Sequence, residues 1–504
     1  MTPRLLRTAL VAATLAVLAV PSAASAANSL EVGIADENVL NGNTPGGADA
    51  TVAQWKASGV QDVRIFAQWD KLVPQDTKDD TKAPAGFNAE DPASYDFANL
   101  DAKIDVVAKY GLNVTLVVTG PGPVWGSSEP ARKNGTWKPD PAQFAKFAAA
   151  ITKNVGPKVA RYIVWNEPNQ GYWLQPQYSC VARKTTIPPF KCTSVAPHLY
   201  RELARAGYDA IHANDPDARV AVGATSSTGI KLPDRANSTT APLTFLRNMA
   251  CVNSKYRSVR SGDCKGFKAV TGDALAYHPH STTKSPGQAD PVSGNARMAD
   301  LPRLIKVIDK LTARKRLKVS GAKRLPLWLD EYGYQTNPPD KRDGHQSPAV
   351  AAAYLQWGWS LAARNPRVET LTQYEWFDEE LGEDKNGDQT FNKWQSGLFT
   401  VDGKPKALAA VFANPIFGWY TKSSGYIWGQ VRPGDAATTV RLQQGGKASS
   451  SFKDYKTITT DKYGIFQVKV PRSTTTRYRF VYTDPNTQAE VTSAAVPLRR
   501  PTGK

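Results

Sequence analysis

The stretch Tyr162-Ile-Val-Trp-Asn-Glu-Pro168 runs from an apolar segment directly into an amide, a carboxylate and a proline. Apolar side chains on both faces are typical of a strand in a parallel sheet that helices cover on both sides. Proline has no backbone N–H to donate to a neighbouring strand, so the strand is expected to end before Pro168. Asn166 and Glu167 should therefore emerge at the carboxyl end of a buried strand.

Similar segments recur along residues 30 to 415, and they alternate with amphipathic stretches rich in alanine and lysine. The expected strands are Leu30–Ile34, Asp62–Ala67, Asn113–Thr119, Ala160–Trp165, Arg219–Ala224, Ala274–Tyr277, Leu325–Leu329 and Glu369–Tyr374. The clearer helices are Ala50–Ser58, Asp96–Tyr110, Pro141–Lys153, Ala196–Asn214, Met298–Lys315 and Pro348–Ala363. Eight β-then-α units over this length predict a (β/α)8 TIM barrel. A doubly wound sheet is the alternative, although no G-x-G-x-x-G sequence follows the first strand.

A second carboxylate stands at the end of the seventh expected strand, in Leu325-Pro-Leu-Trp-Leu-Asp-Glu331-Tyr-Gly-Tyr-Gln335. In a barrel the carboxyl ends of all strands meet at one face, where active sites are built. A single glutamate at a strand end is more simply explained by a salt bridge or a helix cap. Two glutamates at strand ends, both in aromatic surroundings, instead indicate a catalytic pair that cleaves glycosidic bonds with retention.

On these two motifs the chain resembles the clan A glycoside hydrolases, the four/seven superfamily, with its nearest likeness to families 39 and 5. The resemblance covers about residues 30 to 415. It implies that Glu167 is the acid/base and Glu331 the nucleophile. Asn166 matches the residue that binds the sugar 2-hydroxyl. Arg64, in Val63-Arg-Ile-Phe-Ala-Gln-Trp69, matches the arginine that keeps the nucleophile ionised and oriented.

Two further segments extend the resemblance and also depart from it. His278, in Ala276-Tyr-His-Pro-His280, resembles the His-x-Tyr element of the clan, but His280 stands where tyrosine is usual. A structural histidine is the equal alternative for His278. Trp376, in Gln373-Tyr-Glu-Trp-Phe-Asp378, matches the aromatic platform beneath the sugar, with packing at the top of the barrel as the alternative.

The remaining candidates for the cleft are aromatic. The histidine that the clan often has on strand 3 is missing, and Trp125 or Thr119 occupies that region. Trp69 ends the second strand, and Trp173 follows the Asn-Glu-Pro motif, where it is a candidate wall of a leaving-group subsite. The long connections at 170–194 and 226–272 are expected to wall the cleft.

The cysteines fall into two local pairs, and each pair closes a short polar loop. Disulfides Cys180–Cys192 and Cys251–Cys264 are expected if the protein is exported. Zinc is the weaker alternative, because neither pair has C-x-x-C spacing and the histidines lie elsewhere in the sequence. Residues 384–388 hint at a calcium loop but lack a complete ligand set. We therefore expect no metal and no cofactor.

The amino terminus predicts export. Arg4 and Arg7 precede an apolar run from Ala9 to Val20 and then Ala24-Ser-Ala26, so residues 1–26 form a signal peptide that is removed before Ala27. An uncleaved membrane anchor is the alternative, and no later stretch predicts a transmembrane segment. We expect a secreted protein, extracellular or associated with the cell wall.

The chain carries a formal net charge of +18. This balance favours polyanionic surroundings such as a cell-wall polymer, but the basic residues are scattered, and a solvated basic surface is the simpler interpretation. No nucleic-acid-binding motif is present, so no specific nucleic-acid partner is expected.

After the barrel the pattern changes to short runs rich in threonine, valine and tyrosine. Tyr426–Val431, Thr438–Gln443, Tyr455–Thr460, Ile465–Val470 and Arg477–Tyr482 are expected strands. They predict a small β-sandwich of immunoglobulin-like type over 418–498, followed by a disordered tail, 499–504.

The predicted function is a secreted retaining hydrolase acting on an oligo- or polysaccharide, xylosidase- or arabinosidase-like or glycanase-like, and working as a monomer. The alternative is a non-catalytic carbohydrate- or wall-binding protein on the same barrel. The fold does not choose among sugars.

Overall fold

The computed structural model describes residues 30–74, 80–182, 190–229, 238–342, 344–383, 389–390, 393–448, 450–484 and 487–500. The predicted signal peptide, the candidate calcium loop at 384–388 and the end of the predicted tail lie outside these residues. In the described part of the chain, no helix combines the length and the apolarity needed to cross a bilayer.

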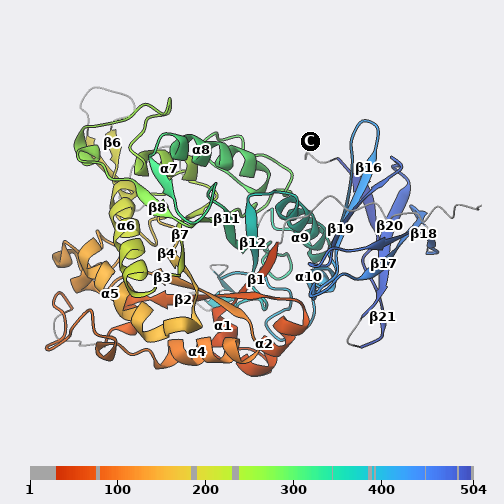
Figure 1. The fold of residues 1–504 in the computed structure, drawn as a ribbon, viewed down its shortest axis with the longest axis horizontal. Helices are drawn as coiled ribbons and strands as arrows, with labels where there is room; N and C mark the ends of the chain where they lie inside the picture. The colour runs from red at the N-terminus through yellow and green to blue at the C-terminus, as the bar shows by residue number, and fades with distance from the viewer. Residues whose placement is uncertain are drawn as a thin grey trace, which may run out of the picture.

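Eight parallel strands close into a barrel, which confirms the predicted fold class (Figure 1). In chain order they are β1 (Glu31–Ala35), β2 (Asp62–Gln68), β3 (Asn113–Thr119), β4 (Arg161–Val164), β7 (Arg219–Ser226), β9 (Ala274–His278), β11 (Leu327–Tyr332) and β12 (Val368–Tyr374). Each pairs with its neighbours in sequence order, and β12 pairs with β1 to close the ring. Each contains most of one of the expected strands.

Helices surround this barrel, as the alternating pattern predicts (Figure 1). They are α1 (Glu37–Leu40), α2 (Gly47–Ala57), α3 (Trp69–Leu72), α4 (Ala98–Lys109), α5 (Pro141–Val155), α6 (Ala196–Asn214), α7 (Pro242–Met249), α8 (Leu301–Ala313), α9 (Pro348–Ala363) and α10 (Ala407–Phe412). Helix α5 illustrates why these segments are helical. Asp140 accepts hydrogen bonds from the first backbone N–H groups, Pro141 fills the first helical position, and Phe144, Phe147 and Ile151 bury one face.

The inside of the barrel is divided along its axis. Small and apolar side chains from β3, β4, β7, β9 and β11 form a dry cluster, with Ile163, Ala221, Ala276 and Trp328 among its members. Polar side chains gather above it, where the strands reach their carboxyl ends. The packed cluster therefore closes the barrel below the site and supports the charged groups there.

Two disulfides are present, as expected. Cys180–Cys192 links the hairpin of β5 (Tyr178–Ala182) and β6 (Phe190–Ser194), and Cys251–Cys264 closes a loop after α7. Short β8 (Val270–Gly272) pairs with β10 (Leu317–Val319), just before β9 and β11 enter the barrel. A minimal hairpin is formed by β13 (Gly382–Glu383) and β14 (Gln389–Thr390).

The carboxyl-terminal region is a mostly antiparallel β-sandwich beside the barrel (Figure 1). Its strands are β15 (Ile416–Tyr420), β16 (Gly425–Gln430), β17 (Thr439–Gly446), β18 (Lys453–Thr459), β19 (Ile465–Val470), β20 (Thr476–Thr483), β21 (Glu490–Thr492) and β22 (Val496–Arg499). β22 pairs with β15 on one side and with β20 on the other, and so connects the two halves. Ile427, Leu442, Phe466 and Phe480 belong to its separate core.

Aromatic stacking joins the sandwich to helix α9. Trp357 stacks on Phe417 with ring centroids 5.2 Å apart, and the Arg432 guanidinium lies 3.9 Å from the centroid of Trp359. Arg432 is buried, and this burial lowers its pKa to about 9. Such an interface holds the sandwich firmly against the barrel wall.

Candidate active site

The chain turns sharply where β4 ends, and this turn positions Glu167. Trp165 has φ 70° and Glu167 has φ 36°, conformations that L-residues adopt only at a cost of about 1–3 kcal/mol each. The Glu167 N–H donates to the carbonyl of Ala224 on β7 at 2.9 Å, which ties the turn to the next strand of the barrel. The backbone is thus held in an unfavourable conformation at the residue that the motif predicted to be catalytic.

Glu167 and Glu331 converge on a single imidazole nitrogen. His278 Nδ1 lies 3.0 Å from Glu167 Oε1 and 3.4 Å from Glu331 Oε2. These two carboxylate oxygens are therefore no farther apart than the sum of the two distances. That limit is compatible with the roughly 5–5.5 Å between the carboxyl groups of retaining glycosidases.

Arg64, on β2, holds the nucleophile candidate from below. Its Nη2 lies 3.0 Å from Glu331 Oε1 and donates to Asn166 Oδ1 at 2.7 Å, while its Nε donates to Asp330 at 3.0 Å. All three partners are buried. One guanidinium group therefore holds two carboxylates and an amide together.

Mutual interactions shift the pKa values of the charged groups in this cluster. Burial alone would lower the pKa of His278, but Glu331 and Asp330 outweigh it and raise this pKa to about 10. Burial would likewise raise the pKa of Glu331, yet His278, Arg64 and His280 hold it at about 2. Asp330 also has a lowered pKa, because His278 and Arg64 outweigh its burial. At neutral pH the site therefore contains an imidazolium and an ionised Glu331.

His280, which stands where the resemblance leads one to expect tyrosine, still reaches the nucleophile candidate. Its Nε2 lies 3.4 Å from Glu331 Oε2, and its ring is 5.1 Å from that of Trp394. Trp394 also packs edge-on against Tyr374 at 5.3 Å and remains partly exposed. An aromatic face is therefore available beside Glu331, on a residue that the sequence motifs did not identify.

Trp173 and Trp125 have different surroundings. Trp173 is partly exposed and stacks on Phe66 at 5.7 Å, and Phe66 lies beneath the Arg64 guanidinium at 4.5 Å. Trp173 therefore covers the barrel mouth near the charged cluster. Trp125 packs against Trp69 and lines a separate hollow of about 270 Å³ at the rim, together with residues after β2 and β3.

The platform role predicted for Trp376 is wrong in this structure. Trp376 is only 3% exposed, and it packs edge-on against Trp55 of α2 and Phe412 of α10. It belongs to the layer between barrel and helices, the alternative that the sequence left open. Trp69 is also a core residue, because it is fully buried and stacks on Phe147 of α5 at 5.4 Å.

The sequence reasoning assigned no role to Asp330, although Asp330 contacts both Arg64 and His278. Neighbouring side chains on a regular strand point to opposite faces, so Asp330 and Glu331 would be expected to diverge. The pairing of β11 with β12 shifts register between Leu329 and Tyr332, and this irregularity brings both carboxylates to the site.

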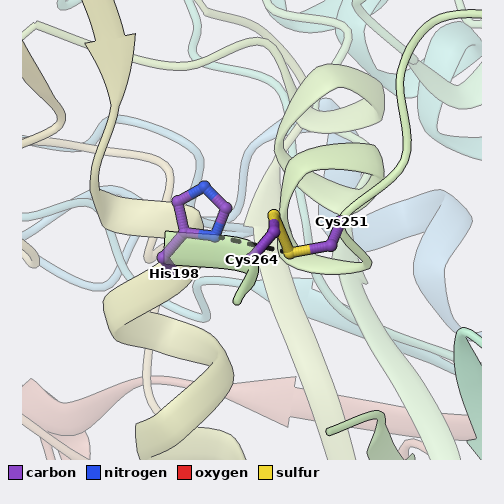
Figure 2. Close-up of side chains that lie close together, drawn as sticks. All are labelled: His198, Cys251 and Cys264. Carbon is purple, nitrogen blue, oxygen red and sulfur yellow. Dashed lines mark hydrogen bonds between the residues drawn. A yellow bond between two sulfur atoms is a disulfide. The ribbon is translucent and has the colours of Figure 1, made fainter. Parts of the chain in front are cut away.

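Two groups of donor atoms within the described residues have metal-like spacing. In the first, His278, His280 and Glu331, both ring nitrogens of His278 already face carboxylates, and Arg64 places a positive charge beside Glu331. The second is His198 with Cys251 and Cys264 (Figure 2). Its sulfurs are bonded to each other, and Arg201 donates to Cys251 Sγ at 3.2 Å. The structure therefore brings a histidine to the cysteines, contrary to the sequence expectation, but provides no thiolates.

No protein-family model matches the chain, and no curated protein matches it. Among solved structures, the chain is similar to a family 39 glycoside hydrolase from Bacteroides cellulosilyticus (14% identity, 88% of this chain and 81% of that chain, TM-score 0.49). It is also similar to a family 39 β-xylosidase from Caulobacter crescentus (16% identity, 84% of each chain, TM-score 0.44). A third is a family 5 subfamily 18 protein from Streptomyces cattleya, solved with GlcNAc (17%, 76% and 78%, TM-score 0.46).

Both families that the sequence motifs resemble occur among these structures. At 14–17% identity, this likeness shows the fold alone.

Proposed function

We propose that this protein is a retaining glycoside hydrolase in which Glu331 is the nucleophile and Glu167 the acid/base. The observation that carries the proposal is the convergence of both carboxylates on His278 Nδ1, at 3.0 Å and 3.4 Å, at the carboxyl ends of β4 and β11. Opposed carboxylates at this spacing are what a double displacement requires.

In the first step, the ionised Glu331 attacks the anomeric carbon while Glu167 gives its proton to the departing glycosidic oxygen. The C–O bond to the leaving group breaks, and an ester between the sugar and Glu331 forms. In the second step, Glu167, now a carboxylate, takes a proton from water. The water oxygen bonds to the anomeric carbon, and Glu331 leaves as a carboxylate.

Arg64 and His278 support this cycle through charge. They keep Glu331 ionised before attack and stabilise it again as a leaving group in the second step. Arg64 can only donate, so it holds the Asn166 oxygen toward itself and directs the Asn166 NH2 group away. That NH2 group is the donor available for a sugar hydroxyl next to the reacting carbon.

The substrate is a neutral or acidic glycoside of an oligo- or polysaccharide, of the β-xyloside, arabinoside or β-glycan type. Turnover should be screened with nitrophenyl glycosides and polysaccharides. Glu331→Gln should be inactive on all of them. Glu167→Gln should lose about 10²–10⁴-fold on substrates with poor leaving groups, but much less on dinitrophenyl glycosides, whose departure needs no proton.

Azide provides the second test. It should restore activity to Glu331→Gly and give a glycosyl azide of inverted configuration. The proposal fails if both glutamine variants keep a few per cent of wild-type activity on poor leaving groups. Sugar binding without turnover on any substrate would support the non-catalytic alternative.

We also propose that the protein is secreted, on the strength of the signal-peptide pattern in residues 1–26, and that it works as a monomer. Protein recovered from culture medium should begin at Ala27 and elute at the size of one chain. A protein retained in the membrane with its first residues intact would contradict this.

A further inference from the structure

A strongly basic surface lies away from the active site, at the amino-terminal end of the barrel. A hollow of about 530 Å³ is bordered by α6, β8 and the segment that follows α8. Its basic lining residues are Arg205, Lys268, Arg314, Lys315, Arg316 and Lys318, against one acidic residue, Asp209. A second hollow shares Lys315 and Lys318 and adds Lys323, Arg324 and one acidic residue, Asp309, which pairs with Arg367 at 2.7 Å. We call the two together the basic groove.

The position of the basic groove follows from the barrel topology. β8 and β10 lead directly into β9 and β11, and β8 packs beside α6 (Figure 1). The groove is therefore near the strand ends opposite those that bear Glu167 and Glu331. A ligand held there does not occupy the catalytic cleft.

Most cations of the groove lack acidic partners. Lys268, Arg314, Lys315, Arg316 and Lys318 form no ion pair with any described residue, whereas Arg205 pairs with Glu202 at 2.7 Å. The helix dipole accounts for Arg314 at the end of α8, but not for Lys268 or Lys318 on other elements. Lys315 has φ 55°, at a position after a helix where glycine is usual. These cations therefore lie close together despite their mutual repulsion and despite the unfavourable backbone conformation of Lys315.

The side chain of Arg316 is held in place by several contacts, so the groove is more than a set of mobile lysines. Its guanidinium lies 3.6 Å from the centroid of Phe267, and it donates to the carbonyls of Ala250 and Cys251 at 2.8 Å and 3.0 Å. Phe267 follows closely after the loop that Cys251–Cys264 closes. Burial and the nearby Arg201 and Arg260 lower the pKa of Arg316, as expected where positive charge is not neutralised.

The aromatic rings beside the groove are covered by cationic side chains, and this bears on which kind of polyanion can bind. Arg316 and Arg201 both lie over Phe267, while Lys310 and Arg314 lie over Tyr256. Proteins that bind single-stranded nucleic acid need open aromatic faces on which bases can stack. Here the rings carry cations instead, an arrangement that presents charge to carboxylates or phosphates along a chain.

We propose that the basic groove binds an anionic carbohydrate polymer, and so holds the protein on an acidic glycan while the cleft on the opposite end stays free. The shared chemistry is a sugar chain with repeated negative charges, either uronic acid carboxylates or the phosphodiesters of a teichoic acid. A chain rather than a single ion is indicated because the cations extend across two adjoining hollows. This binding does not depend on the proposed hydrolase activity.

The test is binding of full-length protein to polygalacturonate, teichoic acid, neutral xylan and duplex DNA at increasing salt. The variant Lys268→Ala/Arg314→Ala/Lys318→Ala removes three exposed charges. The control Lys453→Ala/Lys456→Ala/Lys469→Ala removes three exposed charges from the sandwich. The groove variant should bind the acidic glycan at least about tenfold more weakly, with a shallower salt dependence, while the control and wild type bind alike.

Which polymer is retained identifies the source of the negative charge, carboxylate or phosphodiester. Melting temperatures and aryl-glycoside turnover should match among the three proteins, since the substituted residues are exposed and distant from the cleft. Equal losses in groove variant and control, unchanged binding of both acidic glycans by the groove variant, or a preference for DNA over both acidic glycans would each overturn the proposal.

Discussion

Replacing Arg64 by methionine should damage both the stability of the protein and the acid tolerance of its proposed activity. The substitution keeps a long apolar stem but removes the contacts of Arg64 with Asp330, Glu331 and Asn166. Removing one partner of a buried ion pair typically costs about 3–5 kcal/mol, because the other charge stays buried without compensation. His278 remains beside both carboxylates, so a loss near the lower end, about 3 kcal/mol, is expected.

The effect on catalysis follows from the protonation of Glu331. Its pKa of about 2 lies below the usual 4.5, and this shift corresponds to about 3 kcal/mol in favour of the ionised form. His278 makes the largest contribution and Arg64 the next. Without Arg64 the pKa should rise by about 1–2 units, so that Glu331 becomes protonated at higher pH and attack is lost there.

The assay is kcat/KM for an aryl glycoside from pH 2 to 9, together with urea unfolding followed by tryptophan fluorescence. Arg64→Met should move the acid limb upward by about 1–2 pH units and lower the unfolding free energy. Arg64→Lys keeps the charge but not the planar fork, so it should shift the limb less while still losing rate. An unchanged acid limb, with activity within twofold of wild type in Arg64→Met, would refute this account of the site.

Two further predictions concern neighbouring residues. The pKa of His278 is raised to about 10 from 6.5, so the stability it contributes is complete below pH 6.5 and is lost as pH rises through 10. The unfolding free energy should therefore fall over that range by at most about 5 kcal/mol, and by much less in His278→Gln; equal slopes in both proteins would contradict this. Trp394→Ala should raise KM about tenfold with little change in stability, whereas Trp376→Ala should cost about 3–5 kcal/mol of stability. The reverse pattern in melting and kinetic measurements would restore the platform role to Trp376.

The barrel, and the placing of Glu167 and Glu331 at strand ends, were predictable because a strand that is buried on both faces has apolar residues throughout its sequence. The run before Asn166 had to be apolar throughout, and the first polar side chains after it had to stand at the strand end. The same reasoning applied to Glu331. These are local properties, and a linear pattern records them.

Other features depend on which segments meet in space. An aromatic residue at a strand end can face the cleft or the helices, and α2 and α10 decided that Trp376 faces the helices. Trp394 lies on an irregular connection with no periodicity to reveal its direction. Asp330 joins the site only through a shift in the pairing of β11 with β12.

Sequence by itself therefore determined the barrel and placed the two glutamates at strand ends, because strand burial and strand ends are encoded locally. The expectation that Arg64 serves Glu331 came from the family resemblance. Tertiary structure alone decided the protonation of the site, since the pKa values of His278 and Glu331 arise from groups on β2, β9 and β11 brought within about 3 Å. It also gathered the basic groove from α6, β8 and the segment after α8, which lie far apart in the chain. Charge acts through space, so its consequences appear only once the chain has folded.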